Sequence, residues 1–337
     1  MTFIELGELC DKGTSNLAQK DLLIDSGRYP VYGAAGEITK VDFYQQSKPY
    51  LGIVKDGAGV GRVMRLPSNS SVIGTLQYIF PKENVDIKYL YYLIKYLDLG
   101  KSNTGATIPH IYFKDYKKRK VRAKSYNEQK YIGKIFELID GNLITYNRIL
   151  ECYDLLIKSR FVEMFGDIRE RGRFKAKKWK DVLDIFNGKD YKAVQVDKGG
   201  YPVYGSGGII ARANDYICPA GTIIIGRKGS INNPILVNEK FWNVDTAFGI
   251  VPKEIINISY LYYFCKQYNF NYLNKATTLP SLTKRDLLEI EINIPDLEEQ
   301  VKFSGFVNQI NKLKADVQKS IDETQLLMDS LMQEYFG

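Results

Sequence analysis

Two long stretches of this chain carry apolar residues at alternating spacings of three and four, which is the pattern of an amphipathic helix. One covers residues 136–164 and the other covers residues 307–335. Neither contains a proline, and each follows a capping-box sequence, at residues 125–128 and 296–299. The pattern predicts two long helices, each with one apolar stripe that needs a partner.

We expect the two stripes to pack against each other as a coiled coil, because an isolated helix would leave its stripe in water. A helix of about 36 residues is roughly 54 Å long at 1.5 Å per residue, so an antiparallel pair would hold two globular units at opposite ends. The predicted seam consists of Phe136, Ile139, Leu143, Tyr146, Leu150, Ile157, Val307, Ile310, Val317, Ile321, Met328 and Leu331.

The residues before each predicted long helix follow a different pattern. Short β-rich runs, such as residues 50–54 and 222–225, are bounded by glycine, asparagine and proline. Residues 89–97 and 260–268 are interpreted as helices that are mostly buried, because their many aromatic residues are more typical of a core than of a surface. Each region is therefore predicted to be a globular unit of mixed strands and helices.

The sequence is a tandem duplication. Tyr29-Pro30-Val31-Tyr32-Gly33 recurs as Tyr201-Pro202-Val203-Tyr204-Gly205, and the Tyr-Leu-Tyr-Tyr string at residues 89–92 recurs at residues 260–263. Each copy is long enough to bury a core of its own. The predicted fold class is α+β: two mixed α/β domains in tandem, each followed by a long helix, with the helices packed as an antiparallel coiled coil of pseudo-twofold symmetry. The predicted parts are a first domain at residues 1–124, a helix at 125–166, a linker at 167–176, a second domain at 177–295 and a helix at 296–337.

Composition limits the class of protein. The chain has 337 residues, of which 45% are hydrophobic, and it contains no apolar run long enough to span a membrane. Its first residues lack the basic stretch and apolar core of a secretion signal, so we expect a cytoplasmic protein. The cysteines, Cys10, Cys152, Cys218 and Cys265, are scattered and are interpreted as buried thiols rather than metal ligands or a disulfide.

Positive charge collects on the globular part of each copy. Residues 1–124 hold 19 Lys and Arg against 12 Asp and Glu, and residues 177–295 hold 15 against 11, within a chain of net charge +8. The predicted C-terminal helix is acidic by comparison. Basic globular units favour a polyanionic partner, and nucleic acid is the first candidate.

The motifs that common catalytic sites require are missing from the sequence. It contains no Pro-Pro for the active-site tetrad of a DNA methyltransferase, and Lys95 occupies the position of the first glycine of a P-loop. His110 is the only histidine, and Ser281 replaces it in the second copy. Asp115 with Glu128 leaves a metal-dependent nuclease open as an alternative, although Glu128 also has a capping role. We expect no catalytic residue and no metal site.

Several strings give the chain a resemblance to a known family. They include residues 201–208 (Tyr-Pro-Val-Tyr-Gly-Ser-Gly-Gly), residues 226–231 (Gly-Arg-Lys-Gly-Ser-Ile), residues 244–247 (Val-Asp-Thr-Ala) and residues 279–282 (Leu-Pro-Ser-Leu). In their order and spacing, these strings resemble the specificity subunit of type I restriction–modification enzymes over almost the whole chain. The first copy departs from them, with Lys-Asp-Gly-Ala-Gly at residues 55–59 and Ile-Pro-His-Ile at residues 108–111.

The resemblance implies a non-catalytic subunit. Each globular unit would be a target-recognition domain that reads one half of a bipartite, asymmetric site on double-stranded DNA. The coiled coil would fix the distance between the half-sites and dock two methyltransferase subunits, and restriction subunits would join that complex. S-adenosylmethionine and ATP are expected in the partner subunits, with no cofactor in this chain. A tandem module that binds another polyanion remains a further alternative.

Candidate DNA contacts are cations for phosphates, forked side chains for base edges, and hydroxyls in glycine-rich loops. In the first unit they are Tyr32, Lys55, Arg62, Lys101, Thr104, Thr107, His110 and Lys114. In the second unit they are Tyr204, Ser206, Arg227, Lys228, Asn232, Asn233, Lys275, Thr277, Thr278 and Lys284.

Overall fold

The computed structural model describes residues 2–22, 27–102, 109–170, 173–274 and 280–337, and the chain forms two compact units. Unit 1 comprises residues 1–147 and 318–337, and unit 2 comprises residues 148–317. The structural units therefore differ from the sequence copies. Each unit combines one globular part with the first half of its own long helix and the second half of the other long helix.

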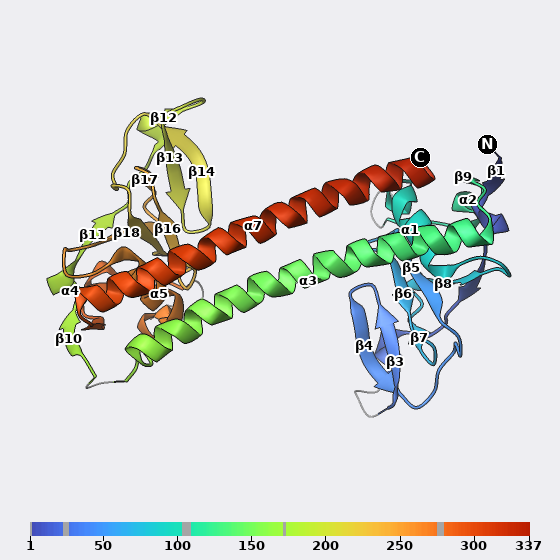
Figure 1. The fold of residues 1–337 in the computed structure, drawn as a ribbon, viewed down its shortest axis with the longest axis horizontal. Coiled ribbons are helices and arrows are strands. Elements are labelled where there is room, and N and C mark those ends of the chain that lie inside the picture. The colour runs from blue at the N-terminus through green and yellow to red at the C-terminus, as the bar shows by residue number, and fades with distance from the viewer. Residues whose placement is uncertain (1, 23–26, 103–108, 171–172, 275–279) are drawn as a thin grey trace. The chain divides into compact units, whose positions relative to one another are not determined.

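Unit 1 contains a four-stranded sheet in the order β2-β8-β5-β6, a three-stranded sheet β4-β3-β7 and a two-stranded sheet β1-β9 (Figure 1). Its strands are β1 (Phe3–Glu5), β2 (Cys10–Thr14), β3 (Tyr29–Gly33), β4 (Gly36–Val41), β5 (Tyr50–Val54), β6 (Val63–Leu66), β7 (Ser71–Val72), β8 (Leu76–Pro81) and β9 (Lys120–Arg122). Its short helices are α1 (Ile87–Leu97) and α2 (Phe113–Tyr116), with 3-10 turns η1 (Leu6–Glu8), η2 (Gln19–Asp21) and η3 (Leu99–Ser102).

Unit 2 repeats this arrangement with sheets β11-β18-β15-β16, β12-β14-β13-β17 and β10-β19. Its strands are β10 (Lys175–Lys178), β11 (Leu183–Asn187), β12 (Gln195–Val196), β13 (Tyr201–Gly205), β14 (Gly208–Ala213), β15 (Thr222–Gly226), β16 (Ile235–Val237), β17 (Trp242–Asn243), β18 (Ala247–Pro252) and β19 (Glu291–Ile294). Its short helices are α4 (Trp179–Val182), α5 (Ile258–Gln267) and α6 (Lys284–Leu288), with 3-10 turns η4 (Lys192–Val194) and η5 (Phe270–Leu273).

The buried centre of each unit explains why these strands form. Every residue of β5 and of β15 is buried, as expected of a central strand that is apolar on both faces. The repeated Tyr-Pro-Val-Tyr-Gly string forms β3 and β13, and Val31 and Val203 at its centre are completely buried. The interpretation of residues 89–97 and 260–268 as buried helices is confirmed by α1 and α5.

The two long helices are α3 (Tyr126–Phe165) and α7 (Leu297–Phe336). In unit 1 the Phe136 ring stacks on the Phe336 ring with centroids 5.6 Å apart, and in unit 2 the Phe161 ring meets the edge of Phe303 at 5.5 Å. In both units the early part of one helix packs on the late part of the other. The antiparallel pairing is therefore confirmed, and the predicted seam residues are all buried or half-buried.

The ends of the long helices are buried on a second face that the seam pattern did not include. Phe161 and Phe165 pack on Tyr260 of α5, at 5.4 and 4.8 Å. In the same way, Phe336 packs on Tyr89 of α1 at 5.5 Å. These rings join each long helix to the core of a globular part as well as to the other long helix.

The repeated glutamines fix the start of each long helix. The side chain of Gln300 is completely buried, accepts a hydrogen bond from the Asn257 N–H at 2.8 Å and donates to the Pro295 carbonyl at 2.8 Å. Gln129 likewise accepts from the Asp86 N–H at 3.0 Å. The repeated Glu-Gln pair thus ties the N-terminus of each long helix to the residue that caps α1 or α5.

Some expectations need correction. The capping box at residues 125–128 is present, but at α7 the Glu299 carboxylate instead pairs with Lys302 at 2.9 Å, and no side-chain bond closes the box among the described residues. Cys10, Cys218 and Cys265 are buried, whereas Cys152 lies exposed on α3.

Within the described ranges, no helix is long and apolar enough to cross a membrane.

Candidate nucleic-acid interface

In unit 1 the loop after β5 is hydrogen-bonded to the segment before α2. The Gly57 N–H donates to the Pro109 carbonyl at 3.0 Å, and the Ile111 N–H donates to the Lys55 carbonyl at 3.0 Å. Asp56 and His110 lie opposite each other in an antiparallel bridge between these two bonds. We call this contact between the two segments the loop junction of unit 1.

Unit 2 has the same loop junction, after β15 and before α6. The Gly229 N–H donates to the Pro280 carbonyl at 3.1 Å, the Leu282 N–H donates to the Arg227 carbonyl at 2.9 Å, and Lys228 bridges Ser281. Gly57 and Gly229 both have a positive φ, of 81° and 78°, a conformation that side chains other than glycine rarely adopt. The backbone of the two junctions is thus equivalent.

The side chains at the two junctions differ in charge. In unit 1 a carboxylate oxygen of Asp56 and the Nδ1 of His110 are hydrogen-bonded, and the Lys55 ammonium lies 3.8 Å from the other carboxylate oxygen. In unit 2 the same positions hold Lys228 and Ser281, next to the exposed Arg227. One junction therefore offers an acceptor with an imidazole, and the other offers cationic donors.

Further candidate residues surround these junctions. Lys114 lies 5.1 Å above the ring of Tyr112, and that ring packs on His110 with centroids 4.1 Å apart. Arg62 donates to the Ala34 carbonyl at 3.0 Å and so reaches the turn between β3 and β4. Ser206, on the equivalent turn of unit 2, lies next to Gly226, where an added Cβ would be 3.1 Å from the Ser206 Cβ. The structure thus brings Lys55, Arg62, His110 and Lys114 together, and likewise Ser206, Arg227 and Lys228.

Three further candidates also have their polar groups occupied within the protein. The Lys284 ammonium donates to the Ile185 carbonyl at 2.7 Å, and Lys101 pairs with Asp98 at 3.1 Å. The Asn232 oxygen accepts from the Phe270 N–H at 2.7 Å, which fixes the start of η5. A contact with DNA would have to compete with these bonds.

The remaining candidates are placed as follows. Tyr32 and Tyr204 are half-buried strand residues, and burial raises the pKa of both phenols, so they are neutral at neutral pH. Tyr204 packs on Phe241 at 5.2 Å, and Asn233 is exposed. Thr104, Thr107, Lys275, Thr277 and Thr278 lie outside the described residues.

The candidate nuclease residues do not come together as a metal centre. Glu128 accepts a hydrogen bond from the Ser125 hydroxyl at 2.7 Å, and this bond and a backbone bond lower the pKa of its carboxyl. Over the part of the chain that the structure describes, no group of three His, Cys, Asp or Glu side chains could hold a metal ion. The carboxylate of Glu128 therefore has a structural role as a helix cap.

Sequence reasoning found most of the junction residues but missed Asp56, Tyr112 and Ser281. Asp56 is acidic, so a search for cations and hydroxyls passes over it although it adjoins Lys55. Alignment of the two copies gives a signal for Ser281, because residues 279–282 align with residues 108–111 and Ser281 then stands at the position of His110. Only the backbone bonds show that both strings face the loops after β5 and β15.

Comparison with known proteins agrees with this architecture. The family model for the type I restriction modification DNA specificity domain matches residues 1–151 and 172–324. The chain belongs to this family, and family membership assigns it to the specificity subunits rather than to the catalytic subunits of these systems.

The chain is also similar to individual curated proteins. A putative type I specificity subunit of Mycoplasma pneumoniae is 28% identical over 152 residues, which cover 42% of this chain and 49% of that protein. The MjaVIII type I restriction enzyme specificity subunit of Methanocaldococcus jannaschii is 25% identical over 309 residues, covering 77% of this chain and 71% of that one. The chain thus spans about half the length of the first relative and most of the second.

Solved structures share the fold. The S subunit of a type I restriction–modification system from M. genitalium has a TM-score of 0.68 at 18% identity and covers 100% of this chain and 96% of its own. A chain from a structure of type I R-M complex assembly and conformational transition has a TM-score of 0.61 at 13% identity, covering 99% and 97%.

Proposed function

We propose that this chain is the DNA-specificity subunit of a type I restriction–modification system and reads a bipartite, asymmetric target with one half-site per unit. The observation that carries the proposal is the pair of loop junctions. Their backbones are equivalent, but the positions that hold Asp56 and His110 in unit 1 hold Lys228 and Ser281 in unit 2. Equivalent readers with different side chains would recognise two different sequences.

Both junctions have chemistry that suits base edges. A carboxylate accepts the amino hydrogens of cytosine in the major groove, and a lysine ammonium donates to the O6 and N7 of guanine. Cations beside each junction, such as Lys114 and Arg227, suit phosphate contacts that position the reader. The target-recognition domains would be residues 1–124 and 177–295, joined by the helices at 125–166 and 296–337 and the linker at 167–176.

The long helices would dock two methyltransferase subunits, and restriction subunits would join the complex. In support, α3 and α7 carry apolar side chains outside their shared seam, including Leu155 at 62% and Leu326 at 71% exposure. S-adenosylmethionine and ATP would bind to those partners, and the complex would act in the cytoplasm.

The experiment is to map methylated bases in cells that have the partner methyltransferase, with and without this chain. We expect methylation of one split sequence only when the chain is present. Methylation of the same split sequence in its absence would overturn the proposal. Purified complex that binds heparin but does not distinguish specific from random duplex DNA would favour a general polyanion-binding module instead.

A further inference from the structure

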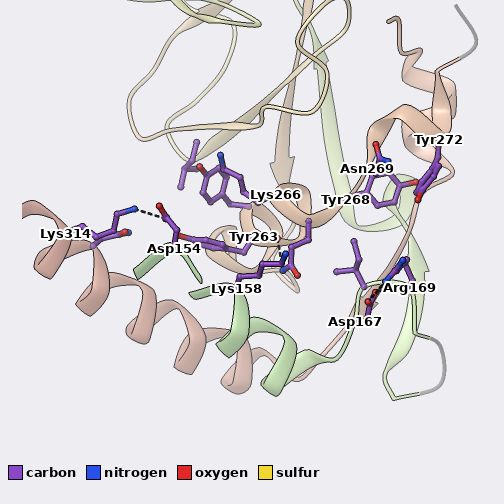
Figure 2. Close-up of a pocket in the computed structure, with 15 residues that line it drawn as sticks. Asp154, Lys158, Asp167, Arg169, Tyr263, Lys266, Tyr268, Asn269, Tyr272 and Lys314 are labelled. Carbon is purple, nitrogen blue, oxygen red and sulfur yellow. Dashed lines mark hydrogen bonds and ion pairs between the residues drawn. The ribbon is translucent and has the colours of Figure 1, made fainter. Parts of the chain in front are cut away.

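Unit 2 contains a pocket of about 1000 Å³ that is separate from its loop junction (Figure 2). It lies among the second half of α3, strand β16, α5, η5 and the first half of α7. Tyrosines from α5 and the following residues line it, including Tyr262, Tyr263, Tyr268 and Tyr272, together with Lys158 and Lys266. The proposed DNA reading makes no use of these residues.

Unit 1 provides an internal comparison, because it has the same fold. Tyr91, Lys95 and Asp98 line a hollow of about 510 Å³ there. These residues are 171 positions before Tyr262, Lys266 and Asn269, the offset of the duplication. The two hollows therefore share these three positions, but the hollow of unit 1 is otherwise lined by residues 59–63 and is about half as large.

In unit 1, two acids of α3 pair with the cations next to Tyr91. The Arg65 guanidinium lies 5.3 Å above the Tyr91 ring and donates to Glu137 at 2.9 Å. The Tyr92 hydroxyl donates to Asp140 at 2.7 Å, and Lys95 lies 3.9 Å from the other oxygen of that carboxylate. In unit 1 the charged side chains around Tyr91 are thus joined in ion pairs.

Unit 2 has lost these acids. Leu236 pairs with Ile223 in the register position where Arg65 pairs with Leu51. Asn308 and Asn311 stand 171 positions after Glu137 and Asp140, so amides replace these two acids. Lys158 stands 171 positions before Asp329, a residue of unit 1, so a cation replaces that acid. Of these replacements, Leu236 and Asn311 line the pocket of unit 2, where unit 1 has ion-paired side chains.

The cations of the pocket are in excess over its acids. Asp154 pairs with Lys314 at 2.7 Å, and Asp167 pairs with Arg169 at 2.7 Å (Figure 2). Lys266 lies 5.6 Å above the ring of Tyr262. Among the described residues, neither Lys158 nor Lys266 has a carboxylate within 4 Å. The pocket therefore offers two lysine ammoniums to an anion.

The neutral lining suits an aromatic group. Burial raises the pKa of Tyr263 to about 12, so its phenol is neutral at physiological pH. Tyrosine rings stack on nucleobases, and the amides of Gln267, Asn269 and Asn311 can both donate and accept hydrogen bonds. The volume is at the upper end of the range for small-molecule sites, roughly 300–1000 Å³.

We propose that this pocket binds a free nucleotide, with the phosphates at Lys158 and Lys266 and the base against the tyrosines. A ligand that is both anionic and aromatic matches the two parts of the lining, and lysine is a common partner of phosphate. The inference does not depend on DNA recognition, since it concerns different residues and is measured by a different assay.

The test is isothermal titration calorimetry of the full-length chain with ATP, AMP, adenosine and inorganic triphosphate at constant ionic strength. We expect saturable binding of ATP to one site, with adenosine and inorganic triphosphate each at least about tenfold weaker, because each lacks half of the contacts. No saturable ATP binding, or triphosphate that binds as tightly as ATP, would overturn the proposal.

Unit 1 supplies the matched variant. Leu236→Arg combined with Asn311→Asp copies Arg65 and Asp140 into unit 2 and is expected to weaken ATP binding by about tenfold or more. Lys266→Gln should weaken it similarly, whereas Lys95→Gln in unit 1 should leave it unchanged. Circular dichroism checks the fold of each variant, and if the double variant misfolds, Lys266→Gln alone decides.

A final arm distinguishes a free nucleotide from nucleic acid. Duplex DNA and a single-stranded oligonucleotide are titrated into the ATP complex. We expect ATP to stay bound. Competitive displacement by either nucleic acid would assign the pocket to a nucleic-acid strand, and binding that Lys266→Gln leaves unaltered would place the ATP elsewhere. Either result would overturn the proposal.

Discussion

Single residues at equivalent positions carry the difference between the two units. Lys228 follows the buried strand β15 and stands where unit 1 has Asp56, after the equivalent strand β5. The backbone bonds around both residues are the same to within about 0.1 Å. A change of side chain there alters what the surface offers to a base without altering how the loop is held.

Lys228→Ala is expected to weaken binding of the specific DNA by roughly tenfold or more, since a good base contact contributes about 1–3 kcal/mol. The loss should be confined to the half-site read by unit 2. The measurement is a fluorescence anisotropy titration of the assembled complex against duplexes altered in one half-site or the other.

The matched control is Lys253→Ala, which also removes one positive charge from unit 2. Ala247, at the start of β18, pairs with Gly226 beside the junction, and Lys253 follows the opposite end of that strand. Lys253 pairs with Asp184 at 4.0 Å. A strand of six residues is about 20 Å long, so this lysine is remote from the junction. Equal losses for the two variants would show that Lys228 acts only through general charge.

Glu137 links stability to pH. Hydrogen bonds from Lys88 and then from Arg65 lower the pKa of its carboxyl in the folded protein. A carboxyl with a lowered pKa contributes stability above its unfolded value, about 4.3, and loses that contribution as the pH falls through the folded value. Glu137→Gln should therefore lower the Tm near pH 7, and the difference from the unmodified chain should shrink toward pH 3.

Thermal melts followed by circular dichroism across this pH range provide the check. Glu83→Gln is the control, because Glu83 lies exposed in the turn after β8. Its melts should follow those of the unmodified chain at every pH. A Glu137→Gln deficit that stayed constant down to pH 3 would mean that packing, rather than charge, explains the loss.

At the scale of the element, the long helices were predictable and their second face was not. Spacings of three and four located the seam, because Phe136 and Ile139 repeat with the helix period. Phe161, Phe165 and Phe303 lie off that stripe and are buried because they pack on one another and because α5 packs against the same helix ends. One-dimensional periodicity shows how many apolar faces a helix has, but not which neighbour covers each face.

Phe161→Ala should destabilise unit 2 by about 3–5 kcal/mol, the usual cost of removing a fully buried phenylalanine. The ring is 1% exposed and stacks on Tyr260 at 5.4 Å. Trp179 and Trp242, the two tryptophans of the chain, both belong to unit 2, so their fluorescence in a urea titration reports this loss.

Leu155→Ala, six residues earlier on α3, is the control for helix propensity and surface area. Its side chain is 62% exposed, and the expected change is within about 0.5 kcal/mol. A Phe161→Ala variant as stable as Leu155→Ala would contradict the packing of α3 against α5.

At the scale of the whole molecule, the duplication was evident in the sequence, but the exchange of helix halves was not. Repeated strings showed two copies, each predicted as one globular domain followed by its long helix. In the structure, residues 318–337 belong to unit 1 and residues 148–166 belong to unit 2. This follows from antiparallel pairing, which brings the late part of each helix to the globular part that precedes the other helix.

Because the helix contacts are repeated, the globular parts should be exchangeable. Phe336 packs on Tyr89 in unit 1, and its counterpart Phe165 packs on the matching Tyr260 in unit 2. Gln129 and Gln300 likewise make equivalent bonds to the residues that cap α1 and α5. A chain in which residues 1–124 and 177–295 trade places would therefore keep the same aromatic and glutamine contacts at each helix end.

Under the proposed function, this exchanged chain should direct methylation to the same two half-sites in reversed order, with the number of bases between them unchanged. The order reverses because each reader keeps its own junction residues, and the spacing is retained because α3 and α7 keep their lengths. Sequencing of methylated bases in cells that carry the exchanged chain measures both quantities. A chain that folds and assembles but still directs the original order would place sequence recognition in the helices rather than in the globular parts.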